Sequence, residues 1–188
     1  MAYLLHLTDV NSPWWAFTNV MKTLTKILAV FVFTLGAFSA VSAQTSLPSL
    51  SGGSVDVQAQ KGKVVILAVG ASWLPLSSKQ AEFTNALAKK YAGKNVSIYF
   101  IATDSNNPKS KNYATDDQIR QWASTNRLTV TILRDSDGAS VMRKFAVDQL
   151  PAFIVLDKNG SQSGDAFGGI DPKYDVTVPI GKKVDSLL

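Results

Sequence analysis

Continuous apolar runs and stretches of helical periodicity alternate along the chain. Residues 64–69 form an unbroken apolar run rich in β-branched side chains, which predicts a strand buried on both faces. Apolar residues recur at helical spacing from 76 to 91, with Pro75 suited to a first helical turn, and a second apolar run covers 96–102. Strand, helix and strand at this spacing predict a right-handed βαβ unit.

The second half of the chain continues the alternation. Thr115 and Gln118 form a capping-box signature, which predicts a helix that begins there and ends near Asn126. The remaining patterns predict an edge strand at 54–57, a strand at 128–133, a short helix at 141–145, a hairpin made of 152–156 and a strand ending near Phe167, and a short closing helix around 184–188. This order of elements predicts a single α/β domain.

The N-terminal region has the pattern of an export signal. After Met21 come two lysines, an apolar run over 27–38 and small residues up to Ala43. We therefore predict a signal peptide over 21–43 that is cleaved near Ala43, and a mature domain over 44–188 that is periplasmic or secreted. The alternative is an uncleaved membrane anchor, because 27–43 is just long enough to span a bilayer. Residues 1–20 are interpreted as an upstream extension that the working protein lacks.

Composition narrows the chemistry. The 188 residues are 46% hydrophobic and 18% charged, as in a globular protein, and they include no cysteine and a single histidine, His6. This inventory excludes disulfide exchange, cysteine-based zinc sites and Ser-His-Asp or Cys-His nucleophiles from any form that lacks the first residues. We expect no metal and no cofactor.

Charge gives weaker information. Beyond residue 43 the chain has 17 Lys and Arg against 13 Asp and Glu, a net charge of +4. The lysines are scattered along the sequence, and no aromatic residues are interleaved with them as a nucleic-acid surface requires. We therefore expect a solvated basic surface and no nucleic-acid partner. Contact with a membrane is expected only through an uncleaved signal, with weak attraction to anionic lipid as the alternative.

Two strings and the distance between them resemble one fold family. "GKVVILAVGASW" precedes the first helix, and "LRDSDGASVMRKFAVDQLPAFIVLDKNG" contains a Val-x-x-Leu-Pro and an Asp-x-x-Gly pattern. Together they resemble the thioredoxin-like fold of exported TlpA-like and ResA-like thiol-disulfide oxidoreductases, over about residues 46–169. The resemblance implies a mixed central sheet flanked by helices. It also implies that Pro151 is the family's cis-proline and that Leu74 and Ser77 occupy the two Cys-x-x-Cys positions.

The departure from the family pattern removes the family's reaction. Leu74 has no proton to lose, and the Ser77 hydroxyl is too weakly acidic to replace a thiol. The place of the buried acid that often serves proton transfer in such enzymes holds Ala68. The catalytic site is therefore predicted to be degenerate, and the chain is predicted to be redox-inactive.

What remains is a predicted apolar surface. The resemblance brings together six residues that in the family receive an extended peptide: Trp73, Leu74, Pro75, Leu76, Leu150 and Pro151. We call these six residues the apolar patch. One hypothesis is a protein-binding or scaffold module whose partner is an extended or unfolded protein segment. The alternatives are that Leu74 and Leu76 are ordinary core residues, or that the fold supports a non-thiol enzyme that uses carboxylates or Ser77 with Lys79.

Overall fold

A five-stranded mixed sheet forms the centre of the protein. The computed structural model describes residues 45–188, and the strand order is β5-β4-β3-β6-β7. Strands β4 and β5 run parallel to the central β3, while β6 and β7 form an antiparallel hairpin beside it. The strands are β3 (Val64–Gly70), β4 (Val96–Ala102), β5 (Thr131–Arg134), β6 (Ala152–Leu156) and β7 (Phe167–Gly168). The predicted α/β, thioredoxin-like fold class with a mixed sheet is confirmed.

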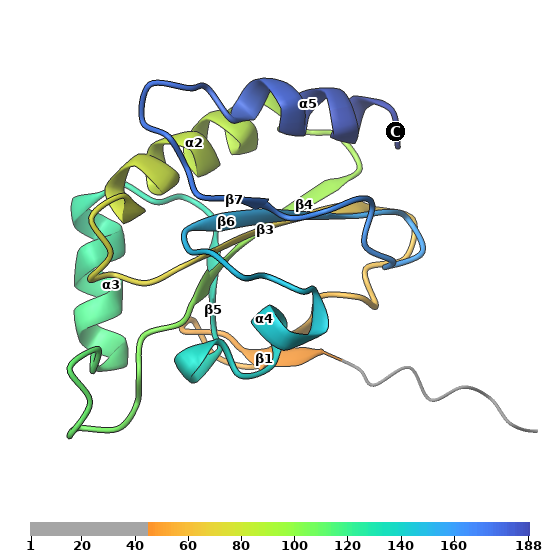
Figure 1. Ribbon diagram of the computed structural model, residues 1–188. Coiled ribbons are helices and arrows are strands. Elements are labelled where there is room, and N and C mark those ends of the chain that lie inside the picture. Colours follow the sequence, from red (N-terminus) through yellow and green to blue (C-terminus); the bar gives the residue numbers. More distant parts are fainter. Residues whose placement is uncertain (1–44) are drawn as a thin grey trace, which may run out of the picture. The chain divides into compact units, whose positions relative to one another are not determined.

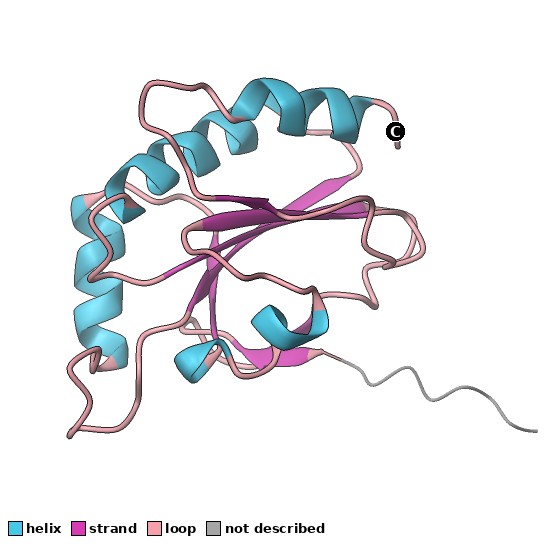
Figure 2. Cartoon of the chain, viewed as in Figure 1, coloured by secondary structure: helices cyan, strands magenta, loops and turns pink. Residues whose placement is uncertain are grey.

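Helices cover both faces of the sheet (Figures 1 and 2). The first face packs against α2 (Ser77–Lys90), α3 (Asp116–Thr125) and α5 (Thr177–Asp185), whose apolar residues meet alternate positions of β3 such as Ile66. The opposite positions, such as Leu67, pack against α4 (Val141–Lys144) and the N-terminal hairpin. All seven residues of β3 are buried, as the continuous apolar run predicted.

Most predicted elements form close to their expected bounds. The capping box at Thr115 is present, since its hydroxyl accepts from the Gln118 N–H while the Gln118 side chain accepts from the Thr115 N–H. Strand β5 begins three residues later than expected, because the Leu128 N–H donates to the Ala123 carbonyl and so still closes the end of α3.

Helix α5 begins well before its predicted position. Asp175 Oδ1 accepts from the N–H and the hydroxyl of Thr177 at that start, which holds the pKa of Asp175 below its usual value.

The strand expected at 54–57 forms, but it lies outside the five-stranded sheet. Strand β2 (Ser54–Asp56) pairs with β1 (Ser46–Pro48), which the sequence did not predict, in a two-stranded sheet of its own. The hairpin meets the central sheet through a bridge from Ser49 to Leu133 of β5. Within residues 45–188, no helix has both the length and the apolar character needed to cross a membrane. The predicted signal peptide and the upstream extension lie outside the described residues.

Candidate binding site at the carboxyl end of strand β3

The candidate site is built around the turn of residues 71–76 that joins β3 to α2. The N–H of Leu74 donates to the Ala71 carbonyl at 3.2 Å, and the N–H of Ser77 donates to the Leu74 carbonyl at 3.1 Å. The Ser77 hydroxyl is fully buried and also donates to the Ala71 carbonyl. These three bonds close the turn on itself and fix the position from which α2 begins.

A buried carboxylate holds this turn from the neighbouring strand. Asp104 follows the end of β4 and is fully buried, and its two oxygens lie 3.0 and 3.1 Å from the Ser72 nitrogen. The Ser72 hydroxyl donates to the same carboxylate. Because β3 and β4 are parallel, their carboxyl ends meet at one edge of the sheet. Asp104 was not predicted from the sequence, although an acid two residues after a strand of apolar residues is a recognisable signal.

Gln80 fixes the same edge from within α2. Its Nε2 donates to the Val69 carbonyl at 3.0 Å and to the Ala152 carbonyl at 2.8 Å, so it ties β3 to β6. The side chain is fully buried, and a Cβ at Gly70 would lie 2.2 Å from Gln80 Oε1. Glycine at position 70 therefore leaves the space that this amide occupies. Gln80 was not among the site residues predicted from the sequence.

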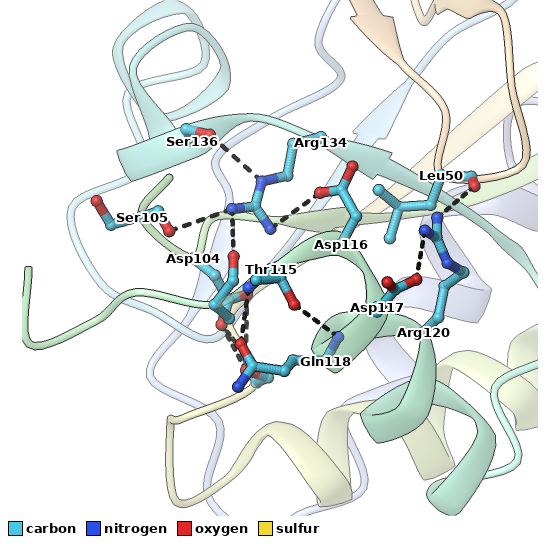
Figure 3. A network of polar contacts seen from close by, with 12 residues as sticks. Leu50, Asp104, Ser105, Thr115, Asp116, Asp117, Gln118, Arg120, Arg134 and Ser136 are labelled. Carbon is cyan, nitrogen blue, oxygen red and sulfur yellow. Dashed lines mark hydrogen bonds and ion pairs between the residues drawn. The ribbon is translucent and has the colours of Figure 1, made fainter. Parts of the chain in front are cut away.

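The loop between β4 and α3 is held by Arg134 (Figure 3). The Arg134 guanidinium is largely buried and donates to the Ser105 carbonyl at 3.2 Å and to the Ala114 carbonyl at 2.9 Å, which lie at the two ends of the loop. Its Nη1 lies 3.7 Å from Asp116 Oδ1. The exposed segment between Ser105 and Ala114 thus starts and ends on a fixed base next to Asp104.

The apolar patch lies at this edge. Trp73 is 49% exposed, Pro75 is exposed, and Leu74, Leu76 and Leu150 are half-buried, whereas Pro151 is buried. Neither Leu74 nor Leu76 belongs to, or packs against, the two clusters of buried apolar residues in the described part of the chain. The Leu150–Pro151 peptide bond is cis, as expected. The geometry therefore favours a surface over the alternative in which these leucines are core residues.

Backbone groups beside the patch are available for pairing. Within residues 45–188, neither the N–H nor the carbonyl of Leu150 has a hydrogen-bond partner. β6, which starts at Ala152, pairs with β7 only through Ala152 and Phe153. An extended chain laid along Leu150 would therefore find a free donor and a free acceptor.

The geometry gives Ser77 and Lys79 no shared role. The Ser77 hydroxyl is used by the Ala71 carbonyl, and the Lys79 ammonium is paired with Glu82. A shallow hollow of about 370 Å³ lies beside the first turn of α2, lined by Ser78, Lys79, Glu82, Thr125, Asn126 and Arg127. Ser77 does not line it. The polar hollow and the apolar patch are thus separate features of this region.

Comparison with known proteins agrees with the fold. The chain is similar to the thioredoxin-like protein YneN of Bacillus subtilis, with 30% identity over 117 residues; the match covers 61% of this chain and 62% of that protein. It is also similar in structure to the exposed lipoprotein thioredoxin Etrx1 of Streptococcus pneumoniae, with a TM-score of 0.61, 20% identity and coverage of 77% and 100%. A secreted disulfide oxidoreductase of Mycobacterium tuberculosis gives a TM-score of 0.56, 21% identity and coverage of 77% and 96%.

Fold and site thus define a thioredoxin-like protein that has no thiol. The sequence pattern of the Redoxin family matches residues 33–162, and the chain belongs to that family. The family resemblance that the two strings indicated is therefore confirmed. Without a cysteine anywhere in its 188 residues, the chain lacks the group that disulfide exchange requires.

Proposed function

We propose that this protein is an exported, redox-inactive member of the Redoxin family that holds an extended protein segment on the apolar patch. One observation carries the proposal. Exposed Trp73 and half-buried Leu74 lie at the same edge of the sheet as Leu150, whose backbone N–H and carbonyl have no partner within residues 45–188. Apolar side chains provide the contact area, and the backbone groups provide the direction of the bound chain.

The replacement of the thiol by Leu74 changes what the site does with a bound chain. A cysteine at this position would form a mixed disulfide with a cysteine of the partner. Leu74 instead offers a non-reactive apolar surface, so binding is reversible and needs no cysteine in the partner. The second hypothesis is a non-thiol enzyme that uses carboxylates or Ser77 with Lys79, and within residues 45–188 Ser77 and Lys79 are bonded to other groups, Ala71 and Glu82.

The test is a substitution that keeps the fold and removes the apolar contact. Leu74→Asp adds a carboxylate to the patch, and because Leu74 is half-buried and outside the core clusters, stability should fall by no more than about 1 kcal/mol. Binding to an array of immobilised cysteine-free peptides should be lost. The matched control is Leu188→Asp, which puts the same change at an exposed leucine in another part of the chain.

Two outcomes would contradict the proposal. Peptide binding by the wild type that survives Leu74→Asp would place the binding surface elsewhere. A loss of several kcal/mol in the free energy of unfolding would show that Leu74 is a core residue, as the alternative interpretation held.

Export is the second part of the proposal. It rests on the signal-peptide pattern over residues 21–43, and one structural neighbour is itself an exposed lipoprotein. We expect that protein recovered outside the cytoplasm lacks residues 1–43, which intact-mass measurement checks. Protein found in the membrane fraction with residues 27–38 intact would establish an uncleaved anchor instead.

A further inference from the structure

Lysines that are scattered along the sequence gather at the end of the domain opposite the apolar patch. Lys61 and Lys63 lie just before β3, and Lys94 lies two residues before β4. Because β3 and β4 are parallel, both strands start at the same edge. Lys158 lies in the β6–β7 turn, where its carbonyl accepts from the Gly62 N–H at 2.9 Å. This edge is the amino end of the strands, whereas the patch lies at the carboxyl end of β3.

Two helices end at the same place. Lys89 and Lys90 lie in the last turn of α2, and Lys182 and Lys183 lie in the last turn of α5. Lys90 forms an ion pair with Asp185 at 3.1 Å, which joins the two helix ends. Figure 1 shows the end of α5, the C-terminus and the β6–β7 turn on the right of the molecule, and the turn that opens α2 on the left. We call the four strand-end lysines and the four helix-end lysines the lysine-rich end.

This end accounts for the net charge of the described domain. Residues 45–188 have 17 basic and 13 acidic side chains. Eight lysines and only four aspartates (Asp56, Asp157, Asp165 and Asp185) lie at or next to this end, while the rest of the domain has nine of each sign. Within residues 45–188, Lys90 is the one lysine of the eight that forms an ion pair, with Asp185, and Lys158 donates to the Leu188 backbone oxygen.

The surface fits a membrane better than it fits a nucleic acid. Nucleic-acid surfaces combine basic residues with exposed aromatic rings for stacking, and the exposed aromatic residues of the described chain, Trp73, Tyr113 and Tyr174, all lie elsewhere. Lysines in a last helical turn are favoured by the helix dipole, which explains four of the eight. The four lysines at the strand ends lie outside helices, so the helix dipole does not explain their position.

The N-terminal connection lies at the same end. Thr45, to which residues 1–44 are joined, accepts from the Val57 N–H through its carbonyl, and its hydroxyl donates to Gln58 Oε1. Gln58 in turn donates to the Gly160 carbonyl in the β6–β7 turn, two residues from Lys158. Thr45, the first described residue, is therefore linked through Gln58 to the turn that contains Lys158.

We propose that the lysine-rich end docks on a bilayer surface that contains anionic lipid. The apolar patch then faces away from the membrane, since the seven residues of β3 separate the two ends by about 20 Å. Each lysine near an anionic surface raises partitioning by roughly fivefold at moderate ionic strength. The contact is electrostatic, so it weakens as salt is added.

Co-sedimentation with vesicles tests the proposal on the full chain. One set of vesicles contains phosphatidylglycerol and phosphatidylcholine in equal amounts, and the other contains phosphatidylcholine alone. We expect salt-sensitive binding to the anionic vesicles in excess of any binding to the neutral ones. The triple variant Lys61→Glu, Lys63→Glu, Lys94→Glu should lower this partitioning by about a hundredfold or more.

A variant of equal net charge is the control. Lys109→Glu, Lys111→Glu, Lys173→Glu changes three exposed lysines outside the lysine-rich end and should keep the wild-type partitioning. Circular dichroism and thermal unfolding confirm that both variants are folded.

An equal loss in both variants would mean that only total charge matters, and equal binding to both vesicle types would assign the contact to apolar residues. Binding to DNA or polyglutamate without binding to anionic vesicles would identify an acidic macromolecule instead. Each of these three results overturns the proposal, while peptide binding by the patch is measured separately and is unaffected by it.

Discussion

Single residues decide what this site can do. The family resemblance assigns the two cysteine positions to Leu74 and Ser77, and the structure gives these residues unequal surroundings: Leu74 is half-buried at the surface, and Ser77 is fully buried with its hydroxyl on the Ala71 carbonyl. A partly accessible first position and a buried second position are the arrangement that a reactive pair would need. The turn therefore offers one accessible and one buried position but no thiol.

This interpretation predicts that thiols can be put back. The wild type should not reduce insulin disulfides, whereas Leu74→Cys with Ser77→Cys should form an internal disulfide and show slow activity. The two side chains lie one helical turn apart, within reach of the Cβ separation of about 3.5–4.5 Å that a disulfide needs. The amino end of α2 should lower the pKa of the thiol at position 74.

The double variant should also cost some stability and remain slow. Ser77→Cys removes the hydroxyl bond to Ala71, a loss of about 1 kcal/mol. Ala68 supplies no acid for proton transfer. Leu74→Cys alone is the control and should be inactive in the same assay. Insulin reduction by the wild type would refute the redox-inactive assignment, and a double variant without an internal disulfide would mean that the turn has another shape.

The residues that the sequence did not reveal are those whose partners lie far away in the chain. Ser72 and Asp104 are 32 positions apart, and Gln80 reaches Ala152 across 72 positions. A polar residue in an apolar context can be noticed from sequence, but its partner depends on which strands are neighbours. Trp73 and Leu74 could be named because the family resemblance placed them in the turn before the first helix.

Elements were predictable where one local pattern determines them. The runs that became β3 and β6 are apolar throughout because both faces are covered, so no pairing information was needed. The run that became β4 includes Ser97 and is fully buried only in its last three residues, yet its β-branched and aromatic residues were sufficient to predict a strand. The β1–β2 hairpin was not predictable in the same way. Its strands have three residues each, and Leu47 is buried only because β1 lies against the underside of the central sheet.

The loop between β4 and α3 illustrates the same limit. Its sequence, rich in Asn, Ser and Lys, indicates a mobile connection, yet its ends are joined by the Ala114 N–H, which donates to the Ser105 carbonyl at 3.1 Å. Arg134 from β5 then secures both ends. A polar loop sequence describes the exposed residues correctly and gives no information on the buried arginine beneath them.

At the scale of the whole domain, the apolar patch and the lysine-rich end lie at opposite ends of strand β3. Along the sequence the lysines have no pattern, and the apolar patch is divided between residues 73–76 and 150–151. Folding brings each set to one end of the same strands. Net charge was therefore predictable from composition, but its concentration at one end required the strand order and direction.

One buried tyrosine links the last helix to the end of α2 by hydrogen bonds. Tyr91 is 2% exposed, and its hydroxyl donates to Asp185 Oδ1 at 2.8 Å, with the Gly181 carbonyl oxygen at 3.1 Å. The hydrogen bond from Tyr91, together with Lys90, lowers the pKa of Asp185 below its usual 3.8. Burial, followed by the neighbouring Asp185, raises the pKa of Tyr91 above 10.0.

These opposite shifts predict how the attachment depends on pH. The lowered pKa of Asp185 means that its contribution is present above about pH 4 and is lost as the pH falls through the folded-state value. The raised pKa of Tyr91 means that its contribution is present below about pH 10 and is lost as the pH rises through the folded-state value, where a tyrosinate would repel Asp185. Between these limits the hydrogen bond should stabilise the fold at a constant level.

Tyr91→Phe removes this hydrogen bond and keeps the ring in place. We expect it to lower the free energy of unfolding by about 1 kcal/mol near neutral pH, or the melting temperature by roughly 3 °C. The difference from the wild type should shrink below pH 4 and above pH 10, which urea titrations across the pH range would measure. Tyr113→Phe is the control, because Tyr113 is exposed and its hydroxyl has no partner within residues 45–188; it should change stability at no pH. If Tyr91→Phe showed no deficit at neutral pH, the ring's packing, and not its hydroxyl, would hold α5 against α2.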